Sequence, residues 1–382
     1  MKAALTTLGC KVNHYETEAM RELFLADGWE IVAFTEPADV YVVNTCTVTQ
    51  TSDTKSRQMI ARAHRMNPDA LVVAVGCYAQ VSPETVAALE GVGLVLGTSG
   101  RKDIVPRVHE ALSARTTETY IQPIAQQREF EPFSAVRDSR TRATLKIQDG
   151  CVNFCSYCII PYARGPLRSR PLDEISREVA LLANEGYREI VLTGIHLASY
   201  GRDLTGQGLT LLDAIHAASE PDGIRRIRLG SIEPLFVTEQ VAKALAENPK
   251  ICRQFHLSLQ SGSNPVLRRM NRHYTAEEYL HSLELLRTYM PDCAITTDVI
   301  AGFCGETEGE HEETLAFCEQ AAFARMHVFP FSLRKGTKAE ALGDNLPRAV
   351  KEARAKELIA LGKRLTEQYL RSQIGSVVEV LA

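Results

Sequence analysis

The chain has 382 residues, of which 24% are charged and 45% hydrophobic, and its formal net charge is −4. This composition is typical of a globular protein, and ten cysteines in this length are too few for a disulfide scaffold. No stretch reaches about 18 uncharged apolar residues, and residues 1–20 lack the features of a signal peptide. We therefore expect a cytoplasmic protein of two or three domains that makes no contact with a membrane.

Residues 1–114 alternate between predicted strands and predicted helices. Apolar runs rich in β-branched residues predict strands at 3–8, 40–43 and 71–75. Helix-compatible patterns follow them at 18–25, 52–65 and 83–89. This alternation predicts an N-terminal α/β domain with an open parallel sheet.

A cysteine follows each of the three predicted strands, at Cys10, Cys46 and Cys77. In a parallel sheet the carboxyl ends of the strands meet at one edge, which is where open α/β sheets bind ligands. One such cysteine alone would be interpreted as a buried structural thiol. Three in the same topological position predict a metal centre that keeps one open coordination position.

Residues 115–141 lose the alternation and are rich in Gln, Arg, Thr and Pro. They predict an extended linker that runs over the surface. Arg137, Arg140 and Arg142 could contact RNA, but we interpret them as solvated charges.

Residues 151–158, Cys-Val-Asn-Phe-Cys-Ser-Tyr-Cys, carry three cysteines with the spacing C-x3-C-x2-C. Thiolates select zinc, copper(I) or iron–sulfur clusters. A structural zinc requires a fourth ligand nearby, and the next candidates are as distant as His196 and Cys252. Three cysteines on a four-iron cluster leave one iron open to a ligand. The loop therefore favours a catalytic iron–sulfur cluster, with a zinc site or a chance group of buried cysteines as the alternatives.

Residues 142–335 resume the alternation. Strands are predicted at 143–147, 189–192, 224–229, 255–259, 294–301 and 327–331, and helices at 172–185, 211–219, 238–247, 276–289 and 308–324. Six such units predict a parallel, barrel-like sheet with helices outside and the site at the carboxyl ends of the strands.

Two groups of basic residues near these elements could contact an anion. Arg164, Arg168 and Arg170 follow the three-cysteine loop and could bind a carboxylate or an RNA phosphate, or could be solvated. In the helical extension 336–374, the predicted helix 348–373 carries Lys and Arg on its polar side, which is weak evidence for RNA binding.

The three-cysteine loop, with Tyr157 just before its last cysteine, resembles the radical S-adenosylmethionine (SAM) enzymes. The segments Gly-Cys-Lys-Val-Asn at 9–13, Asn-Thr-Cys-Thr-Val-Thr at 44–49 and Gly-Cys-Tyr-Ala-Gln at 76–80 resemble the methylthiotransferases of that superfamily. The first two are similar to the branch that modifies N6-threonylcarbamoyladenosine at position 37 of tRNA. Modification of isopentenyladenosine in tRNA, or of an aspartyl residue in a ribosomal protein, stays an alternative. A non-catalytic metal-binding RNA-interaction protein is the alternative from another class.

The resemblance implies that residues 142–335 form a partial (βα)6 barrel, and it implies two [4Fe–4S] clusters and two molecules of SAM. Cys151, Cys155 and Cys158 would hold the cluster at which SAM yields a 5′-deoxyadenosyl radical, and Cys10, Cys46 and Cys77 would hold the second. The further positions at which it implies SAM contacts are Tyr157, Thr193, Gly194, Ser231, Glu233, Gln260 and Gly302. The substrate would be the anticodon loop of tRNA, with an external electron donor and an external sulfur source. The resemblance implies no particular oligomeric state.

Residues 375–382 resemble the opening strand of the small RNA-binding β-barrel, the TRAM-like domain, with which this family ends. We therefore expect most of that domain to be missing from the chain, and tRNA binding to be weaker for that reason.

Overall fold

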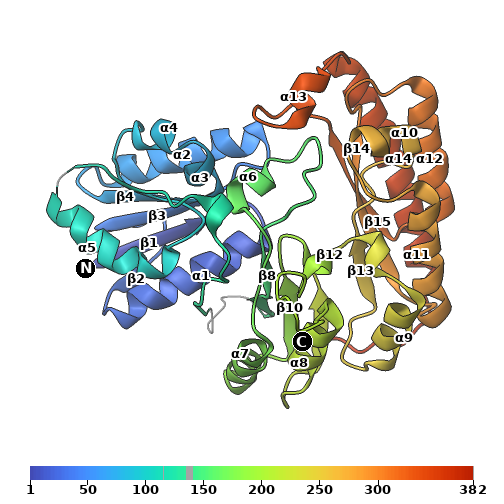
Figure 1. Ribbon diagram of the computed structural model, residues 1–382, viewed down its shortest axis with the longest axis horizontal. Helices are drawn as coiled ribbons and strands as arrows, with labels where there is room; N and C mark the ends of the chain where they lie inside the picture. Colours follow the sequence, from blue (N-terminus) through green and yellow to red (C-terminus); the bar gives the residue numbers. More distant parts are fainter. Residues whose placement is uncertain (115, 135–140, 382) are drawn as a thin grey trace.

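The computed structural model describes residues 1–114, 116–134 and 141–381. Figure 1 shows two α/β units side by side, an N-terminal unit in blue to teal and a second unit in green to red. Arg137 and Arg140 of the predicted linker lie outside the described residues. Arg142 is half exposed and forms a 3.4 Å ion pair with Glu189, which agrees with its interpretation as a largely solvated charge.

A six-stranded parallel sheet forms the N-terminal unit, with the strand order β2-β1-β3-β4-β5-β6. The strands are β1 (Lys2–Thr7), β2 (Glu30–Val32), β3 (Val40–Thr45), β4 (Leu71–Gly76), β5 (Val92–Leu96) and β6 (Glu118–Tyr120). Every residue of β3 and β4 is buried, as expected for strands of a parallel sheet with both faces covered. The three strands predicted from apolar runs are confirmed.

Helices cover both faces of this sheet. They are α1 (Lys11–Ala26), α2 (Gln50–Met66), α3 (Cys77–Val81), α4 (Pro83–Ala87) and α5 (Ile104–Ala114). In Figure 1, α2, α3 and α4 lie on one face, and α1 and α5 lie on the other.

The start of α1 differs from the prediction. The helix begins at Lys11 rather than at residue 18, and Cys10 is its N-cap residue. Gly9, with φ of 102°, turns the chain from β1 into the helix. Apart from Lys11, the polar residues of the first two turns are buried, so the apolar periodicity that marks 18–25 does not extend to them.

The second unit is a partial barrel of parallel strands. They are β7 (Ala143–Lys146), β10 (Glu189–Thr193), β11 (Arg226–Leu229), β12 (Ser231–Ile232), β13 (Gln254–Leu257), β14 (Ala294–Ala301) and β15 (Arg325–Pro330). Their order is β11-β10-β7 in one sheet and β12-β13-β14-β15 in the next, and Gly230 alone separates β11 from β12. Counting β11 and β12 as one interrupted strand, the predicted six-strand barrel is confirmed.

Helices lie outside the barrel, as Figure 1 shows for α10, α11, α12 and α14. The set is α7 (Leu172–Asn184), α8 (Leu211–Ser219), α9 (Glu239–Glu247), α10 (Asn264–Arg269), α11 (Ala276–Tyr289), α12 (Glu308–Ala321), α13 (Lys338–Leu342) and α14 (Arg348–Ser372). Three short elements lie between β7 and α7 in the chain: β8 (Gln148–Asp149), α6 (Ile160–Arg164) and β9 (Arg168–Ser169). The strand β14 alternates between half-buried and buried residues, because its two faces meet different layers.

The segments expected to form a linker and the start of a further domain differ in structure. Within residues 116–134, β6 pairs with β5, and Glu131 accepts the backbone N–H of Lys102 at 2.9 Å. Residues 375–381 form neither a helix nor a strand. Within the described ranges, no helix combines the length and the apolar composition needed to cross a bilayer.

Candidate active site

Two glycines shape the strand ends that carry the N-terminal cysteines. A Cβ atom at Gly9 would lie 2.9 Å from the Cys46 sulfur, and one at Gly76 would lie 2.4 Å from Asn44 Oδ1. Both glycines have positive φ, which other residues rarely adopt. The chain therefore makes a sharp turn after β1 and after β4, and the residue after each turn is one of the predicted ligands.

Asn13 lies at the centre of this group. Its Oδ1 is 3.9 Å from the Cys10 sulfur and 4.0 Å from the Cys77 sulfur. Its Nδ2 donates to the carbonyls of Leu8 at 2.8 Å and of Thr45 at 3.0 Å, so it ties the ends of two strands together. The structure thus brings Cys10, Cys46 and Cys77 to one edge of the sheet, as the topology predicted; we call them the N-terminal triad.

The Cys46 and Cys77 thiols are buried. Burial raises the pKa of both thiols above the ordinary value, because a thiolate loses its hydration in this environment. A bound metal would displace the thiol protons, because thiolates are the form that binds a metal.

The three-cysteine loop begins at a tight crossing of the chain. A Cβ atom at Gly150 would lie 1.8 Å from the Pro166 carbonyl oxygen, and the Cys151 N–H donates to the Gly165 carbonyl at 3.0 Å. The antiparallel pair β8 and β9 closes the base of the loop. Cys151 is therefore held by backbone contacts on both sides.

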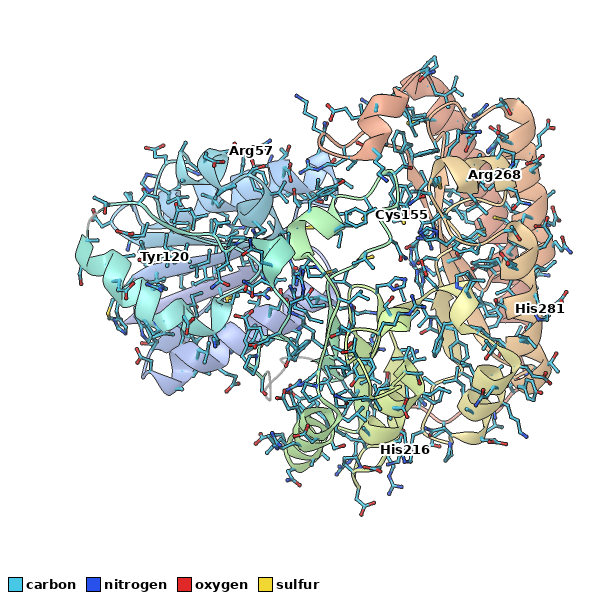
Figure 2. The ribbon with its side chains drawn as sticks, viewed as in Figure 1. Arg57, Tyr120, Cys155, His216, Arg268 and His281 are labelled. Atoms are coloured by element: carbon cyan, nitrogen blue, oxygen red, sulfur yellow. The ribbon has the colours of Figure 1, made fainter. Side chains whose placement is uncertain are left out.

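The chain after α10 holds the far side of the loop. Asn271 donates to the carbonyls of Asn153 at 3.0 Å and Phe154 at 3.1 Å, and Arg272 Nη1 donates to the Cys155 sulfur at 3.3 Å. Phe154 has φ of 46°, a left-handed conformation that these bonds stabilise. In Figure 2, Cys155 lies on this loop between the two units.

The three loop cysteines, which we call the loop triad, affect one another electrostatically. Burial, together with the neighbouring Cys155 thiol, raises the pKa of Cys151 to about 11 and that of Cys158 to about 12. The positive charge of Arg272 acts in the opposite direction. As in the N-terminal triad, a bound metal would displace the thiol protons.

Glu233, one of the expected SAM contacts, lies beside the loop triad. Its carboxylate accepts from Asn153 Nδ2 at 2.9 Å and pairs with Arg272 at 3.1 Å and with His196 at 2.8 Å. Burial alone would raise the pKa of Glu233, but its partners His196 and Arg272 lower it, so the group is a carboxylate. His196 is thus a satisfied polar residue, with Glu233 and Ser199 as its partners.

The other expected contacts occupy different surroundings. Thr193 is buried at the end of β10, and a Cβ atom at Gly194 would lie 2.9 Å from Gln148, whose amide donates to the Gly150 carbonyl at 2.8 Å. The Tyr157 ring packs on Phe303 with centroids 6.3 Å apart.

Three more of the expected contacts lie at strand ends. Ser231 is exposed in β12. Gln260 and Gly302 both have positive φ, and a Cβ atom at Gly302 would lie 2.6 Å from Lys351 of α14.

Helix α6 joins the two triads. It begins two residues after Cys158 and packs on α3, whose first residue is Cys77. At its end, Arg164 is fully buried and its Nε donates to the Cys77 sulfur at 3.3 Å. Arg164 is therefore neither solvated nor available to RNA, in contrast to two of the alternatives for this segment.

A buried charge network surrounds Arg164. Its carboxylates are Glu16, Glu131 and Asp149, and its cations are Arg101, Lys146, Arg164 and Arg168. Glu16 Oε1 lies 2.5 Å from Arg164 and 2.7 Å from Lys146. Four cations against three carboxylates leave one positive charge in excess, beside the N-terminal triad.

Arg170 belongs to a second buried group, in which it pairs with Glu178 and donates to the Tyr15 hydroxyl at 3.2 Å. The solvated-loop alternative is therefore wrong for Arg164, Arg168 and Arg170 alike, because burial and ionic partners determine their positions.

Glu16 is the most strongly coordinated carboxylate of the network. Burial alone would raise its pKa, but Arg101, Arg164 and Lys146 outweigh that effect and hold the pKa at about 2. Replacing Glu16 by Gln leaves the four buried cations of the network with only two carboxylates, Asp149 and Glu131. We expect this change to destabilise the protein by roughly 3–5 kcal/mol at neutral pH, measured by denaturant unfolding.

The destabilisation should depend on pH in one direction. Because the folded pKa of Glu16 lies below its ordinary value of 4.5, its contribution is complete above that pH and is lost as the pH falls toward about 2. The difference between wild type and Glu16→Gln should shrink over that interval. Glu30→Gln, which removes an exposed 3.9 Å pair with Lys2, is the control and should cost less than about 1 kcal/mol. Equal effects of the two changes would contradict this account.

Sequence reasoning did not identify Asn13 or Arg272 as site residues, although Asn13 belongs to a motif that it used. It did single out Arg164, but as a partner for a carboxylate or a phosphate and not for the Cys77 sulfur. No pattern marks Arg272, because its partner Cys155 is 117 residues away. Among the described residues, no three His, Cys, Asp or Glu side chains are placed to hold a single metal ion. In a [4Fe–4S] cluster each cysteine binds a different iron, so convergence on one ion is not required.

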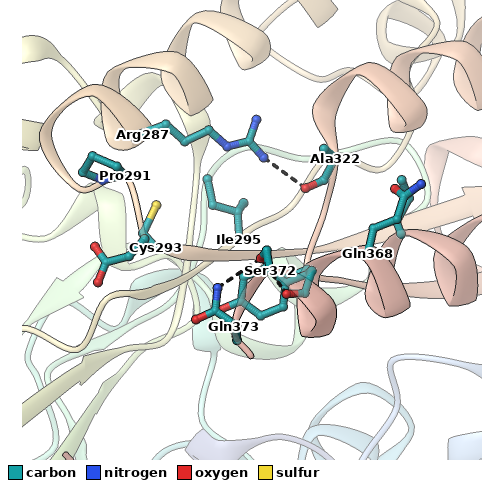
Figure 3. Close-up of a pocket in the computed structure, with 12 residues that line it drawn as sticks. Arg287, Pro291, Cys293, Ile295, Ala322, Gln368, Ser372 and Gln373 are labelled. Atoms are coloured by element: carbon teal, nitrogen blue, oxygen red, sulfur yellow. Dashed lines mark hydrogen bonds between the residues drawn. The ribbon is translucent and has the colours of Figure 1, made fainter. Parts of the chain in front are cut away.

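A pocket of about 290 Å³ lies at the opposite end of the barrel strands (Figure 3). Its lining includes Cys293 and Ile295, at the start of β14, and Tyr369 and Gln373 near the end of α14. Arg287 at its rim donates to the carbonyls of Ala321 and Ala322. None of the predicted site residues lines it.

Two protein-family profiles match the chain. The Radical SAM superfamily matches residues 145–318, and the uncharacterized protein family UPF0004 matches residues 2–97. The two matches cover the loop triad and the N-terminal triad, respectively.

Curated relatives match along nearly the whole chain. Threonylcarbamoyladenosine tRNA methylthiotransferase MtaB of Bacillus subtilis is 44% identical over 99% of this chain and 84% of its own length. The tRNA-2-methylthio-N(6)-dimethylallyladenosine synthase of Thermotoga petrophila is 35% identical over 100% of this chain and 86% of its own length. Among solved structures, the radical SAM methyltransferase TsrM of Kitasatospora setae, with cobalamin and a [4Fe–4S] cluster bound, has a TM-score of 0.62 at 17% identity, over 88% of this chain and 76% of that one.

Proposed function

Because the chain belongs to the radical SAM superfamily and, within it, to the methylthiotransferases, we propose that it adds a methylthio group to N6-threonylcarbamoyladenosine in the anticodon loop of tRNA. The observation that carries this assignment is the contact of α6 with α3, which brings a radical SAM loop and a second cysteine triad to one interface. The higher identity to MtaB than to the dimethylallyladenosine synthase favours the threonylcarbamoyl substrate.

Both triads fit [4Fe–4S] clusters. Each supplies three thiols and one arginine that donates to a cysteine sulfur, at 3.3 Å in both cases. The excess positive charge beside the N-terminal triad suits an anionic cluster. We propose that Cys151, Cys155 and Cys158 hold the cluster that binds SAM, and that the N-terminal triad holds the second.

SAM and the two clusters would supply the radical chemistry that substitution at an unactivated aromatic C–H bond requires. The chain's own residues hold these groups in place. Glu233 and Asn153 fix one side of the loop triad, and Asn271 fixes its backbone. Arg272 and Arg164 each place a fixed donor on one cysteine sulfur. The electron donor and the sulfur source come from outside the chain, and the target base would leave its stack to reach the interface between the units.

Nucleoside mass spectrometry tests the proposal. In tRNA from cells that lack this gene, the methylthio form of threonylcarbamoyladenosine should disappear, and it should return when the gene is restored. The isopentenyladenosine derivatives should stay unchanged in both strains. Unchanged threonylcarbamoyladenosine derivatives would contradict the assignment, and a methylthio group missing from a ribosomal protein instead would redirect it to a protein substrate.

A further inference from the structure

We propose that the exposed face of α2 binds the phosphate backbone of the tRNA substrate, an inference that rests on the proposed function and adds a docking surface to it. The residues of α2 that face solvent are Gln50, Thr51, Thr54, Lys55, Gln58, Ala61, Arg62 and Arg65. This face carries three cations and no acid, on a chain whose formal net charge is −4. Within the described ranges, Lys55, Arg62 and Arg65 form no ion pair, so their charge is available to a partner.

The cationic face begins beside the N-terminal triad. Ser56, on the buried side of α2, donates to the Cys46 carbonyl at 3.1 Å and accepts the Cys46 N–H at 3.3 Å. Arg57 donates to the hydroxyl of Tyr78, the residue after Cys77, at 3.0 Å. Lys55 therefore lies one residue from a side chain that contacts the triad. From there, Arg62 and Arg65 extend the charge by roughly 10–15 Å along the helix.

The second unit adds two cations to the same region. Arg334 is buried and bonds to Asp53 of α2 at 2.5 Å, which neutralises the one acid of that helix. Lys335 and Lys338, on either side of the next turn, are exposed and form no ion pair within the described part of the chain. Figure 1 shows α13, which begins at Lys338, and α2 along the same upper side of the molecule, and Figure 2 labels Arg57 there.

The charges of helix α14 differ from those of α2. Its Lys and Arg residues were the weak evidence for RNA binding in the sequence. Its exposed acids Glu352, Glu357 and Glu367 alternate with its cations. Two of its arginines are already paired, Arg348 with Glu352 and Arg364 with Glu319. Mixed charges of this kind suit a solvated helix, whereas an unpaired row of cations suits a polyanion.

RNA is the polyanion that the position favours. A nucleotide that reaches the interface between the units brings its neighbouring phosphates with it, and α2 starts at that interface. A guanidinium or ammonium group contacts a phosphate whatever the base, so the surface would position the RNA without reading its sequence.

A binding measurement with the whole chain tests the surface. Lys55→Gln, Arg62→Gln and Arg65→Gln are combined, and a control combines Lys356→Gln, Lys363→Gln and Arg371→Gln on α14, which removes the same charge from exposed positions. The probes are a tRNA substrate transcript and phosphatidylglycerol vesicles, titrated at several salt concentrations. The α2 variant should bind tRNA about ten- to a hundredfold more weakly, with a salt dependence lower by about two to three phosphate contacts. The control variant should bind like wild type.

The outcomes separate this inference from the proposed function. Wild-type tRNA affinity in the α2 variant, or an equal loss in both variants, would overturn the docking surface even if the nucleoside assay supports the enzyme. A loss of vesicle binding with unchanged tRNA binding would also overturn it, in favour of an anionic membrane surface. Iron content and the melting temperature of each variant establish that the fold is intact. A charge-conserving variant, Lys55→Arg with Arg62 and Arg65 unchanged, should bind tRNA like wild type.

Discussion

Replacing Cys151, Cys155 or Cys158 by Ala is expected to abolish formation of 5′-deoxyadenosine from SAM, by more than about a hundredfold, since residues that merely support a metal ligand are already worth roughly 10- to 100-fold. The physical reason is that each thiol would bind a separate iron, and the loop offers no substitute. Cys304, Cys252, Cys293 and Cys318 are all buried elsewhere. The measurement is the yield of 5′-deoxyadenosine from anaerobically reconstituted, reduced protein.

The N-terminal triad supplies the comparison. Cys10→Ala, Cys46→Ala and Cys77→Ala should abolish the methylthio product in tRNA, while 5′-deoxyadenosine still forms. Each variant should also lose about half of the bound iron, since one of two four-iron clusters would be missing. Full product from any N-terminal variant would refute the proposal that both triads are required.

Arg164→Met and Arg272→Met are expected to lower the reduction potential of different clusters. Each arginine donates to one cysteine sulfur, Cys77 or Cys155, and such a bond stabilises the reduced, more negative cluster. Removing the Arg164 donor should therefore affect the cluster of the N-terminal triad, and removing the Arg272 donor that of the loop triad. We expect the methylthio product to fall by about 10- to 100-fold in each case.

Redox titration monitored by electron paramagnetic resonance distinguishes these roles from a loss of packing. Each variant is the control for the other, because both remove a buried guanidinium. Arg164→Lys and Arg272→Lys keep the positive charge but not the planar guanidinium donor. Compared with the Met variants, they should therefore restore the stability of the fold more than the reduction potential of the cluster. If either variant shifted the reduction potentials of both clusters equally, the assignment of one arginine to each cluster would be contradicted.

The parts of this site that follow from local chain geometry could be predicted from the sequence. Cys46 and Cys77 follow apolar strands, and the spacing of Cys151, Cys155 and Cys158 is a local pattern, so both triads were found. The barrel strands were also found from short apolar or β-branched segments, although only β7 and β10 are buried along their whole length, whereas β11, β13 and β14 alternate.

The contacts that hold the triads in position could not be predicted. Arg164 contacts Glu16 across 148 residues and Cys77 across 87 residues. Nothing in the sequence around Arg164 indicates either contact. A loop rich in arginine predicts solvent exposure, whereas the partners that bury Arg164 come from another part of the chain. The early start of α1 was missed on similar grounds, because buried polar residues form its first turns.

The ionic contacts of Glu16 also limit how such a protein can evolve. Its two halves match separate family profiles, which suggests modules that could be exchanged between proteins. Yet Glu16 comes from one half, and Lys146 and Arg164 come from the other. A recombinant that joins either half to an unmatched partner would bury charges without their counter-charges, at a cost of several kcal/mol. The halves therefore have to be inherited, and engineered, as one unit.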